Sequence, residues 1–370
     1  MGYVAARGGG RAIEESLRLL ARDRVSQAPT AGVDAILATM PSLVEQVMGE
    51  ASLYAPRLAA LALRQAQGSA EEAVFLLRAF RSTLERPYTS RVIDCAEMDV
   101  ERRISAAFKD VPGGQLLGAT RDYSHRLIDF SLDGETSEEE CALRDRLVEE
   151  ISRESERCDG EGLDACPKVL DYLRREGLLS SCEDDDEPPV DVTMDPLTFP
   201  TPRSARLQTL ARGMTQGVTT LGYAAIRGFG PSHPTVGELR SGEVEVLVDH
   251  PLGDGTQEDS CYVGSLVLTE VESVFSVDAS EGDDSHLGFE IGYGLVMGHQ
   301  ETKAIAMSVL DFCLEQGDER YPTQNEEFVL YHIDGVEATG FVSHLKLPHY
   351  VTFQSKLSSV RSTVEGGDRR

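Results

Sequence analysis

Apolar residues in the first half of the chain recur at the three- and four-residue spacing of amphipathic helices. This spacing predicts helices at 12–24, 41–50, 56–66, 138–156 and 167–176. A further helix is expected after Ser69, because Ser69 and Glu72 have the spacing of a capping box, in which each side chain bonds the other's backbone. The first half of the chain is therefore predicted to be mostly helical.

The pattern changes in the second half, where apolar and polar residues alternate. Val244, Val246 and Val248 stand between acidic residues, which predicts a strand with one polar face. Similar patterns predict a long strand or a hairpin at 262–276, a third strand at 289–295, and helices at 203–212 and 299–315. The strands are expected to pair antiparallel.

A run of like charges separates the two patterns. Residues 183–187 are all acidic, and Pro188 and Pro189 follow, a composition typical of linkers. A chain of 370 residues is long enough for two domains. We expect a mostly helical domain at 1–182 with an acidic insertion at about 133–162, a linker at 183–200, and a domain with a mixed, largely antiparallel sheet at 201–370. The predicted fold class is α+β.

The net charge of −28 limits the classes of partner. Nucleic acids and anionic membranes attract basic surfaces, so neither is an expected partner. The chain has 5 Lys and 30 Arg against 63 acidic residues, a bias found in proteins from concentrated salt. No run approaches the roughly 18 apolar residues that a membrane span needs. The first ten residues lack the apolar core of a secretion signal, and a cytoplasmic location is expected.

The seven cysteines do not form a recognisable metal site. They stand at 95, 141, 158, 166, 182, 261 and 313. None belongs to a C-x-x-C pair, so neither a cysteine zinc site nor an iron–sulfur cluster is supported. We interpret them as scattered reduced thiols, which is the usual state of cysteines in a cytosolic protein.

Three of the eight histidines fall within 18 residues near the C-terminus. His344 and His349 are five apart with Pro348 between them, and His332 lies upstream. On a helix, this spacing would set the rings of His344 and His349 about 140° apart. To face one ion, the two rings need a turn between them, so we expect a loop or an element end. From the residues alone, two explanations remain: half of a tetrahedral zinc site, or two rings that each make a local hydrogen bond.

A second stretch with chemistry is the turn Pro112-Gly113-Gly114. Glycines allow a backbone to approach a phosphate, and Arg103, Lys109 and Arg126 could neutralise its charge. The segment lacks the Gly-Lys-Ser/Thr of a Walker loop, so a plain turn is equally consistent with it. Arg78 and Arg81 share one helix face, where they could bind an anion or lie in solvent.

Several blocks combine these features in a fixed order: residues 108–118 (FKDVPGGQLLG), 123–130, 233–234, 237–246 (GELRSGEVEV), 292–296, 303–304, 326–330 and 338–350 (ATGFVSHLKLPHY). They resemble the I-subunit family of the carbon–phosphorus lyase complex. The resemblance extends from Tyr3 to about Val360. It weakens over 133–200, where the chain is most acidic.

The resemblance implies a subunit of an assembly that degrades phosphonates. In that family the I subunit acts with partner subunits of the G, H, J and L types. It replaces the adenine of ATP by an alkylphosphonate at ribose C1′. A dimer within a hetero-oligomer is expected. Two alternatives remain open: a stand-alone purine nucleosidase, and a non-catalytic scaffold held to a neighbour by zinc.

The resemblance also implies site residues. His344 and His349 match zinc ligands of the family, which gives a Zn²⁺ shared with a partner subunit. Glycosyl transfer needs carboxylates near C1′ and an acid for the leaving base. The catalytic candidates are Asp110, His125, Asp129, His233 and Glu238. The candidates for binding phosphate groups are Lys109, Gly113, Gly114, Arg126, Arg227 and Arg240. For each carboxylate a surface or ion-pair role is the alternative, and for each histidine a structural hydrogen bond.

Overall fold

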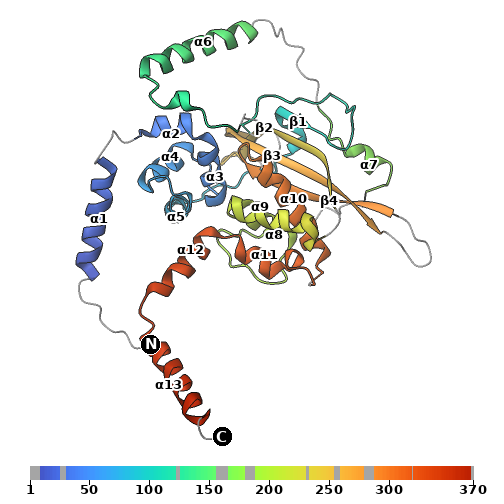
Figure 1. Cartoon of the computed structure of the whole chain (residues 1–370). Helices are drawn as coiled ribbons and strands as arrows, with labels where there is room; N and C mark the ends of the chain where they lie inside the picture. Colours follow the sequence, from blue (N-terminus) through green and yellow to red (C-terminus); the bar gives the residue numbers. More distant parts are fainter. Residues whose placement is uncertain are drawn as a thin grey trace, which may run out of the picture.

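The chain folds around one four-stranded antiparallel sheet with strand order β1-β2-β3-β4 (Figure 1). The computed structural model describes residues 9–25, 31–121, 126–155, 166–179, 188–230, 233–253, 259–278, 287–318 and 320–367. The strands are β1 (Asp99–Ile104), β2 (Thr235–Asp249), β3 (Ser260–Asp278) and β4 (Leu287–Met297). The α+β class predicted from the sequence is confirmed, and so is the antiparallel pairing.

Helices cover one face of the sheet and form a separate group beside it. The group beside the sheet comprises α2 (Val33–Thr39), α3 (Pro41–Ala51), α4 (Pro56–Gln65) and α5 (Ala70–Arg81), which share their own apolar core. The helices on and around the sheet face are α8 (Arg203–Arg212), α9 (Thr215–Ala224), α10 (Glu301–Gln316) and α11 (Glu326–His332). Their core centres on α10 and includes Leu239, Val271 and Leu310.

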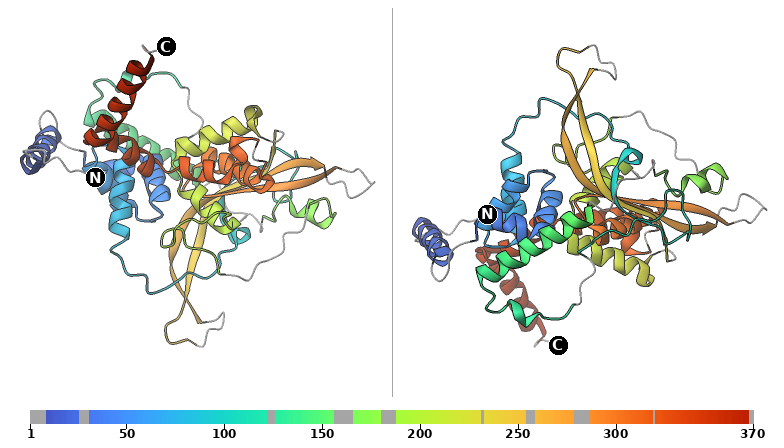
Figure 2. Two further views of the ribbon diagram at one scale, coloured as in Figure 1. Left: turned by 90° about the horizontal axis from the view of Figure 1, so that it is seen from below. Right: turned by 90° about the horizontal axis from the view of Figure 1, so that it is seen from above.

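Three helices extend away from this body (Figure 1). They are α1 (Gly9–Val25), α6 (Ser137–Ser155) and α13 (Tyr350–Gly367), the last of which is joined to the body by α12 (Gly335–Ser343). Paired strands also project. Figure 2 shows the outer parts of the β2–β3 pair and the β3–β4 pair diverging from the body in different directions. No described helix is long and apolar enough to span a membrane.

Most of the predicted elements are present. The helices expected at 12–24, 41–50, 56–66, 138–156, 203–212 and 299–315 are confirmed within a few residues. Ser69 caps α5, since its Oγ accepts the backbone N–H of Glu72 at 3.3 Å. Residues 262–276 form a single strand, not a hairpin. The sequence patterns did not predict α2, α9, α11, α12 or α13.

One predicted helix needs correction, and one strand was not predicted. The helix expected at 167–176 shortens to α7 (Asp171–Arg175), because the chain before it forms a tighter turn, in which the backbone N–H of Asp171 donates to the carbonyl oxygen of Lys168 at 3.2 Å. Strand β1 was not predicted, since Asp99–Ile104 shows no alternation. It forms by pairing with β2, so a segment of the N-terminal half belongs to the sheet of the C-terminal half. The domain boundary at 183–200 stays a prediction, and residues 183–187 lie outside the described residues.

Two glycines bring β4 into direct backbone contact with α10. A Cβ added at Gly292 would lie 1.9 Å from the carbonyl oxygen of Ser308, and one at Gly294 would lie 2.1 Å from that of Ala304. Next to them, the hydroxyls of Ser273 and Ser308 are hydrogen-bonded at 2.7 Å. No side chain larger than hydrogen fits at either glycine, so this approach fixes the position of α10 on the sheet.

The helical group is joined to the sheet by His299, which lies between β4 and α10. Its Nδ1 is 3.0 Å from Glu45 of α3, and its Nε2 is 3.0 Å from Glu101 of β1. Its backbone N–H also donates to Glu45 at 3.0 Å. The hydrogen bond to Glu45, reinforced by Glu101, outweighs burial and raises the pKa of His299 to about 9. The ring is therefore an imidazolium that bridges two carboxylates at neutral pH.

Replacing Gly292 by Ala is expected to lower the free energy of unfolding by about 3 kcal/mol, because the added methyl group would push α10 off β4. Urea unfolding measures this change. The matched control is Gly340→Ala in α12, where no atom lies within 4 Å of the new Cβ. This control should change the stability by less than about 1 kcal/mol. Equal stabilities of Gly292→Ala and the wild type would contradict the close contact.

The ion pairs of His299 predict a pH-dependent stability. A folded-state pKa of about 9 against 6.5 in the unfolded chain means that the contribution is complete below pH 6.5 and is lost as the pH rises through 9. We expect the wild type to lose on the order of 1–2 kcal/mol over this range, since the partly exposed ring is screened by solvent. His299→Gln should lack this component. If the free energy of unfolding changed with pH equally in the wild type and in His299→Gln between pH 6.5 and 9, His299 would not be the source of the pH dependence.

Candidate functional site

One face of the sheet carries charged side chains that are fully buried. Glu238 and Arg240 of β2 are 2% and 1% exposed, and Glu270 and Glu272 of β3 are 2% and 5% exposed. The strand register places Arg240 beside Glu270, and Glu238 beside Glu272. A buried charge is costly unless it is paired, so the contacts of this group determine what can lie against the face.

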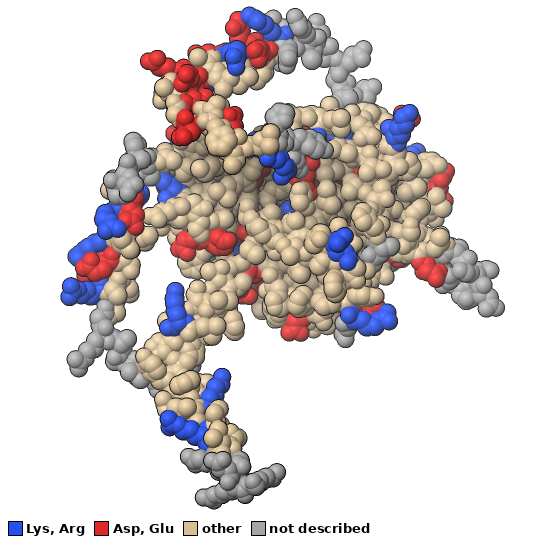
Figure 3. Space-filling view, viewed as in Figure 1, with Lys and Arg blue, Asp and Glu red and all other residues tan. Residues whose placement is uncertain are grey.

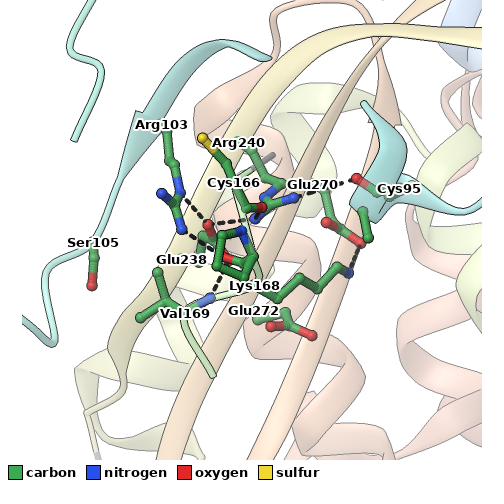
Figure 4. A network of polar contacts seen from close by, with 12 residues as sticks. Cys95, Arg103, Ser105, Cys166, Lys168, Val169, Glu238, Arg240, Glu270 and Glu272 are labelled. Carbon is green, nitrogen blue, oxygen red and sulfur yellow. Dashed lines mark hydrogen bonds and ion pairs between the residues drawn. The ribbon is translucent and has the colours of Figure 1, made fainter. Parts of the chain in front are cut away.

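Glu238 is the centre of the first half of the group (Figure 4). Its Oε1 accepts from Arg103 Nε at 2.6 Å and from Arg240 Nη2 at 2.8 Å. Its Oε2 accepts the backbone N–H of Val169 at 2.9 Å. The Glu238 carboxylate is thus saturated by two guanidinium groups and a backbone donor. It holds β1, β2 and the segment before α7 together.

Arg103 explains the position of the Pro-Gly-Gly turn. Its Nη1 donates to the carbonyl oxygens of Pro112 at 2.6 Å and Gly114 at 3.1 Å, and its Nη2 donates to that of Pro167 at 2.6 Å. Gly113 and Gly114 adopt φ values of 80° and 76°, a conformation that favours glycine. The turn therefore wraps a buried arginine with its carbonyl groups.

The second half of the group is a lysine–glutamate–tyrosine cluster. Lys168 Nζ and the Tyr293 hydroxyl both donate to Glu270 Oε1, at 2.7 and 2.8 Å. Burial opposes the charge of Lys168, but the Glu270 carboxylate outweighs it and raises the pKa of the lysine. Burial, together with Glu270, raises the pKa of Tyr293 and raises that of Cys95 to about 11. The Cys95 thiol is therefore protonated at neutral pH.

Beside this cluster, a cavity of about 670 Å³ opens at the outer edge of β4. We call it the edge pocket. Its lining comes from α7 and the residues after it, β3, β4, α8 and α10: Arg174, Leu179, Arg203, Leu207, Glu272, Glu290, Ile291, Tyr293, Phe312 and Glu315. Arg174 Nη2 donates to Glu272 Oε1 at 2.6 Å. Burial raises the pKa of Glu272 even though Lys168 and Arg174 lie nearby.

A second cavity, of about 420 Å³, lies between α8, α11 and α12 and includes Arg78 and Arg212. Arg78 is paired with Asp334 at 2.7 Å and also donates to the Glu50 carbonyl oxygen, while Arg81 donates to that of Ala51. Both arginines therefore satisfy the terminal carbonyls of α3, a use the sequence did not indicate. Burial and the neighbouring arginines lower the pKa of Arg212 to about 10.

His344 and His349 lie together at an element end, as their spacing required. His344 begins a 3₁₀ turn (His344–Lys346) after α12, and His349 directly precedes α13. The ring centroids are 5.4 Å apart. Nδ1 of His344 contacts the carbonyl oxygen of Phe341, and Nδ1 of His349 lies 2.6 Å from that of Leu347. Nε2 of each ring is left as the nitrogen that can bind a metal.

The structure brings together only part of the predicted glycosyl-transfer site. Glu238, Arg240, Gly113 and Gly114 are joined through Arg103. Asp129 accepts from Ser131 and caps a short 3₁₀ turn (Phe130–Leu132), which lowers its pKa. The other described candidates are exposed at the surface, apart from that group: Lys109, Asp110, Arg126, Arg227 and His233. His125 lies outside the described residues. The roles proposed for all these residues stay predictions.

The sequence patterns missed four members of the buried group: Lys168, Glu270, Glu272 and Tyr293. A signal was present in the run Leu266–Phe275, where two glutamates stand among valines and leucines in a long apolar strand. An apolar run of this length indicates a buried strand, and a glutamate buried in it needs a partner. The described cysteines, at 95, 141, 166, 261 and 313, form no disulfide. Among the described residues no group of three metal ligands is present, so the histidine pair alone cannot complete a zinc site.

Comparison with known proteins identifies the family. Residues 2–366 match the family model described as the bacterial phosphonate metabolism protein PhnI. The alpha-D-ribose 1-methylphosphonate 5-triphosphate synthase subunit PhnI of Rhizobium meliloti (strain 1021) is 45% identical over 97% of this chain and 94% of that protein. The subunit of the same name from Escherichia coli (strain K12) is 42% identical over 97% of both chains. The putative C-P lyase subunit protein HtxH of Stutzerimonas stutzeri is 43% identical over 99% of this chain and 96% of its own. These full-length matches show that the chain belongs to the PhnI family of bacterial phosphonate metabolism proteins.

Proposed function

We propose that this chain is a subunit of an alpha-D-ribose 1-methylphosphonate 5-triphosphate synthase within a carbon–phosphorus lyase complex. The observation that carries the proposal is the full-length similarity, at 42% and 45% identity, to two proteins with that name. The chain would work in the cytoplasm with partner subunits of the G, H, J and L types, as a dimer within the hetero-oligomer. Its substrates would be ATP and an alkylphosphonate.

The reaction is a transfer at ribose C1′. A phosphonate oxygen forms a bond to C1′, and the bond from C1′ to adenine breaks. Adenine leaves with the electron pair of that bond and takes up a proton. The transition state resembles an oxocarbenium ion, so a carboxylate close to C1′ stabilises it. Both oxygens of the candidate Glu238 already accept hydrogen bonds, so this role would require Glu238 to exchange one of them for the substrate.

Exposed apolar surface supports a role within an assembly. The segment 341–364 extends from the body (Figure 1), and nine of its large apolar residues are more than half exposed: Phe341, Val342, Leu345, Leu347, Tyr350, Val351, Phe353, Val360 and Val364. An apolar arm of this size is typical of a protein–protein interface. In Figure 3 most of the visible body is uncharged, while acidic side chains gather on α6. In a chain of net charge −28, such a face is suited to contact with another subunit.

The histidine pair fits a Zn²⁺ that is shared across such an interface. The two rings are close enough to bind one ion, and their Nδ1 atoms are held by backbone carbonyls, which leaves Nε2 of each ring for the metal. Two nitrogens leave two tetrahedral positions for ligands of a partner subunit. A shared Zn²⁺ would hold the apolar arm to its neighbour. The pair is separate in the fold from the edge pocket, so we assign it to assembly.

The test of the transfer reaction is the release of adenine. A reconstituted complex should release adenine from ATP only when both methylphosphonate and the partner subunits are present, because the phosphonate is the acceptor. Chromatography with ultraviolet detection measures the free base. Release by the purified chain alone, unaffected by phosphonate, would favour a stand-alone purine nucleosidase. If ATP stayed intact under all of these conditions, the remaining alternative would be a non-catalytic scaffold subunit.

The zinc proposal predicts a metal content that depends on two residues. His344→Ala and His349→Ala should each lower the zinc of the purified complex at least about tenfold, because one remaining histidine binds weakly. His332→Ala is the matched control, an exposed histidine in α11 whose Nδ1 lies 2.6 Å from a backbone carbonyl. Elemental analysis and gel filtration measure metal and assembly. Stoichiometric zinc in both variants, or none in the wild type, would contradict the site.

A further inference from the structure

The edge pocket has a backbone wall that can form hydrogen bonds with a ligand. Strand β4 is the last strand of the sheet. The N–H of Phe289 donates away from β3 to Leu178 at 3.3 Å, and the N–H of Tyr293 donates away from β3 to Asp311 at 2.9 Å. Strand geometry repeats every two residues, so the N–H and C=O of Ile291 face the same side. Ile291 lines the pocket and therefore offers one donor and one acceptor next to each other.

The pocket also contains a buried acceptor without a partner. Glu272 is only 5% exposed, and its Oε1 is taken by Arg174. Its Oε2 has no hydrogen-bond partner and is shielded from solvent, so a ligand in the pocket reaches it when the Glu272 side chain turns toward the pocket. An unpartnered buried carboxylate oxygen is costly, and a ligand that donates an N–H group to it would remove that cost. The raised pKa of Glu272 is consistent with this lack of a donor.

The charges of the lining argue against a phosphate group as the occupant. Three carboxylates line the pocket, those of Glu272, Glu290 and Glu315. Its two arginines are already ion-paired: Arg174 with Glu272, and Arg203 with the buried Asp311 at 2.7 Å. Among the described residues that line the pocket, a polyphosphate would therefore meet no cation that lacks a carboxylate partner. A neutral ligand with N–H donors is favoured instead.

Apolar side chains provide walls for a flat ring. Leu179, Leu207, Ile291 and Phe312 come from four different segments and meet at the pocket. Its volume of about 670 Å³ exceeds the space that one purine needs and leaves room for an attached sugar. Apolar walls with a few fixed polar groups are typical of sites that bind nucleobases through both faces and one edge.

We infer that the edge pocket is the adenine subsite of this chain, with Ile291 and Glu272 reading the edge of the base. Adenine presents an amine with two N–H donors next to a ring nitrogen that accepts. The C=O of Ile291 and Oε2 of Glu272 accept the two amine hydrogens, and the N–H of Ile291 donates to the ring nitrogen. The inference rests on the proposed function and names the part of the site that holds the leaving base.

The same contacts predict selectivity. Hypoxanthine carries an oxygen in place of the amine, and this oxygen would face the Glu272 carboxylate and the Ile291 carbonyl. The assembled complex should therefore bind adenine at least about tenfold more tightly than hypoxanthine. Glu272→Gln keeps the shape of the side chain but adds an amide donor. This variant should bind adenine more weakly and hypoxanthine more tightly than the wild type does, so that the preference for adenine falls about tenfold or more.

Equilibrium dialysis of radiolabelled adenine and hypoxanthine against the assembled complex tests this prediction. Leu207→Trp is a second variant, at an apolar residue that forms none of the ion pairs itself, and it should weaken the binding of both bases by filling the pocket. The matched control is Glu337→Gln, because Glu337 lines the other cavity. This variant should bind both bases as tightly as the wild type does. Unchanged affinities in both Glu272→Gln and Leu207→Trp, or a wild-type complex that binds neither base, would overturn the inference.

The adenine-release assay separates this inference from the proposed function. If the complex releases adenine from ATP but the two pocket variants bind bases normally, the pocket is not the subsite and the function stands. If the variants lose adenine binding as expected but no complex releases adenine from ATP, the subsite stands and the transfer reaction is wrong.

Discussion

The arrangement of this protein depends on keeping a charged sheet face out of water. Four ionisable side chains of β2 and β3 are buried on that face, and each must have an opposite charge or a hydrogen-bond donor beside it. The partners come from segments remote in the sequence: Arg103 precedes Glu238 by 135 residues, and Lys168 precedes Glu270 by 102. This pairing draws β1 onto the sheet and lays the segment around α7 across its face.

The same constraint separates structural from functional carboxylates. Glu238 has both oxygens occupied and is enclosed by Arg103, Arg240 and the backbone of Val169. Glu272 is equally buried but has one oxygen without a partner, beside a cavity. A protein that needs only stability gains from satisfying every buried oxygen. A buried oxygen that lacks a partner beside a cavity, as in Glu272, is therefore the best indication of where a ligand completes the hydrogen bonding.

The sequence predicted what depends on local periodicity. Amphipathic spacing located α1, α3, α4, α6, α8 and α10, and alternation located β2, β3 and β4 in part. It did not predict β1, whose residues become a strand only through pairing with β2. It also gave β2 a polar face at Glu243 and Glu245, and this face is exposed. It did not show that Glu238 and Arg240 are buried on the other face, because partners such as Arg103 lie far away in the chain. The histidine pair was found because its two members are only five residues apart. Glu272 was not found, since its significance depends on a missing partner, which no sequence pattern records.

The histidine pair and the edge pocket belong to different parts of the fold and are suited to different tasks. The pair lies on an apolar arm with few contacts to the body, where a metal ligand from a second chain can complete its coordination. The pocket lies against the sheet, where Gly292 and Gly294 fix α10 directly on β4 and so hold Phe312 and Ile291 in place. Discrimination between two bases requires walls that do not yield, and this backbone contact provides them. An assembly contact can instead gain order when the partner binds. The rigid sheet edge is therefore the better place for recognition of the base, and the arm for recognition of the neighbouring subunit.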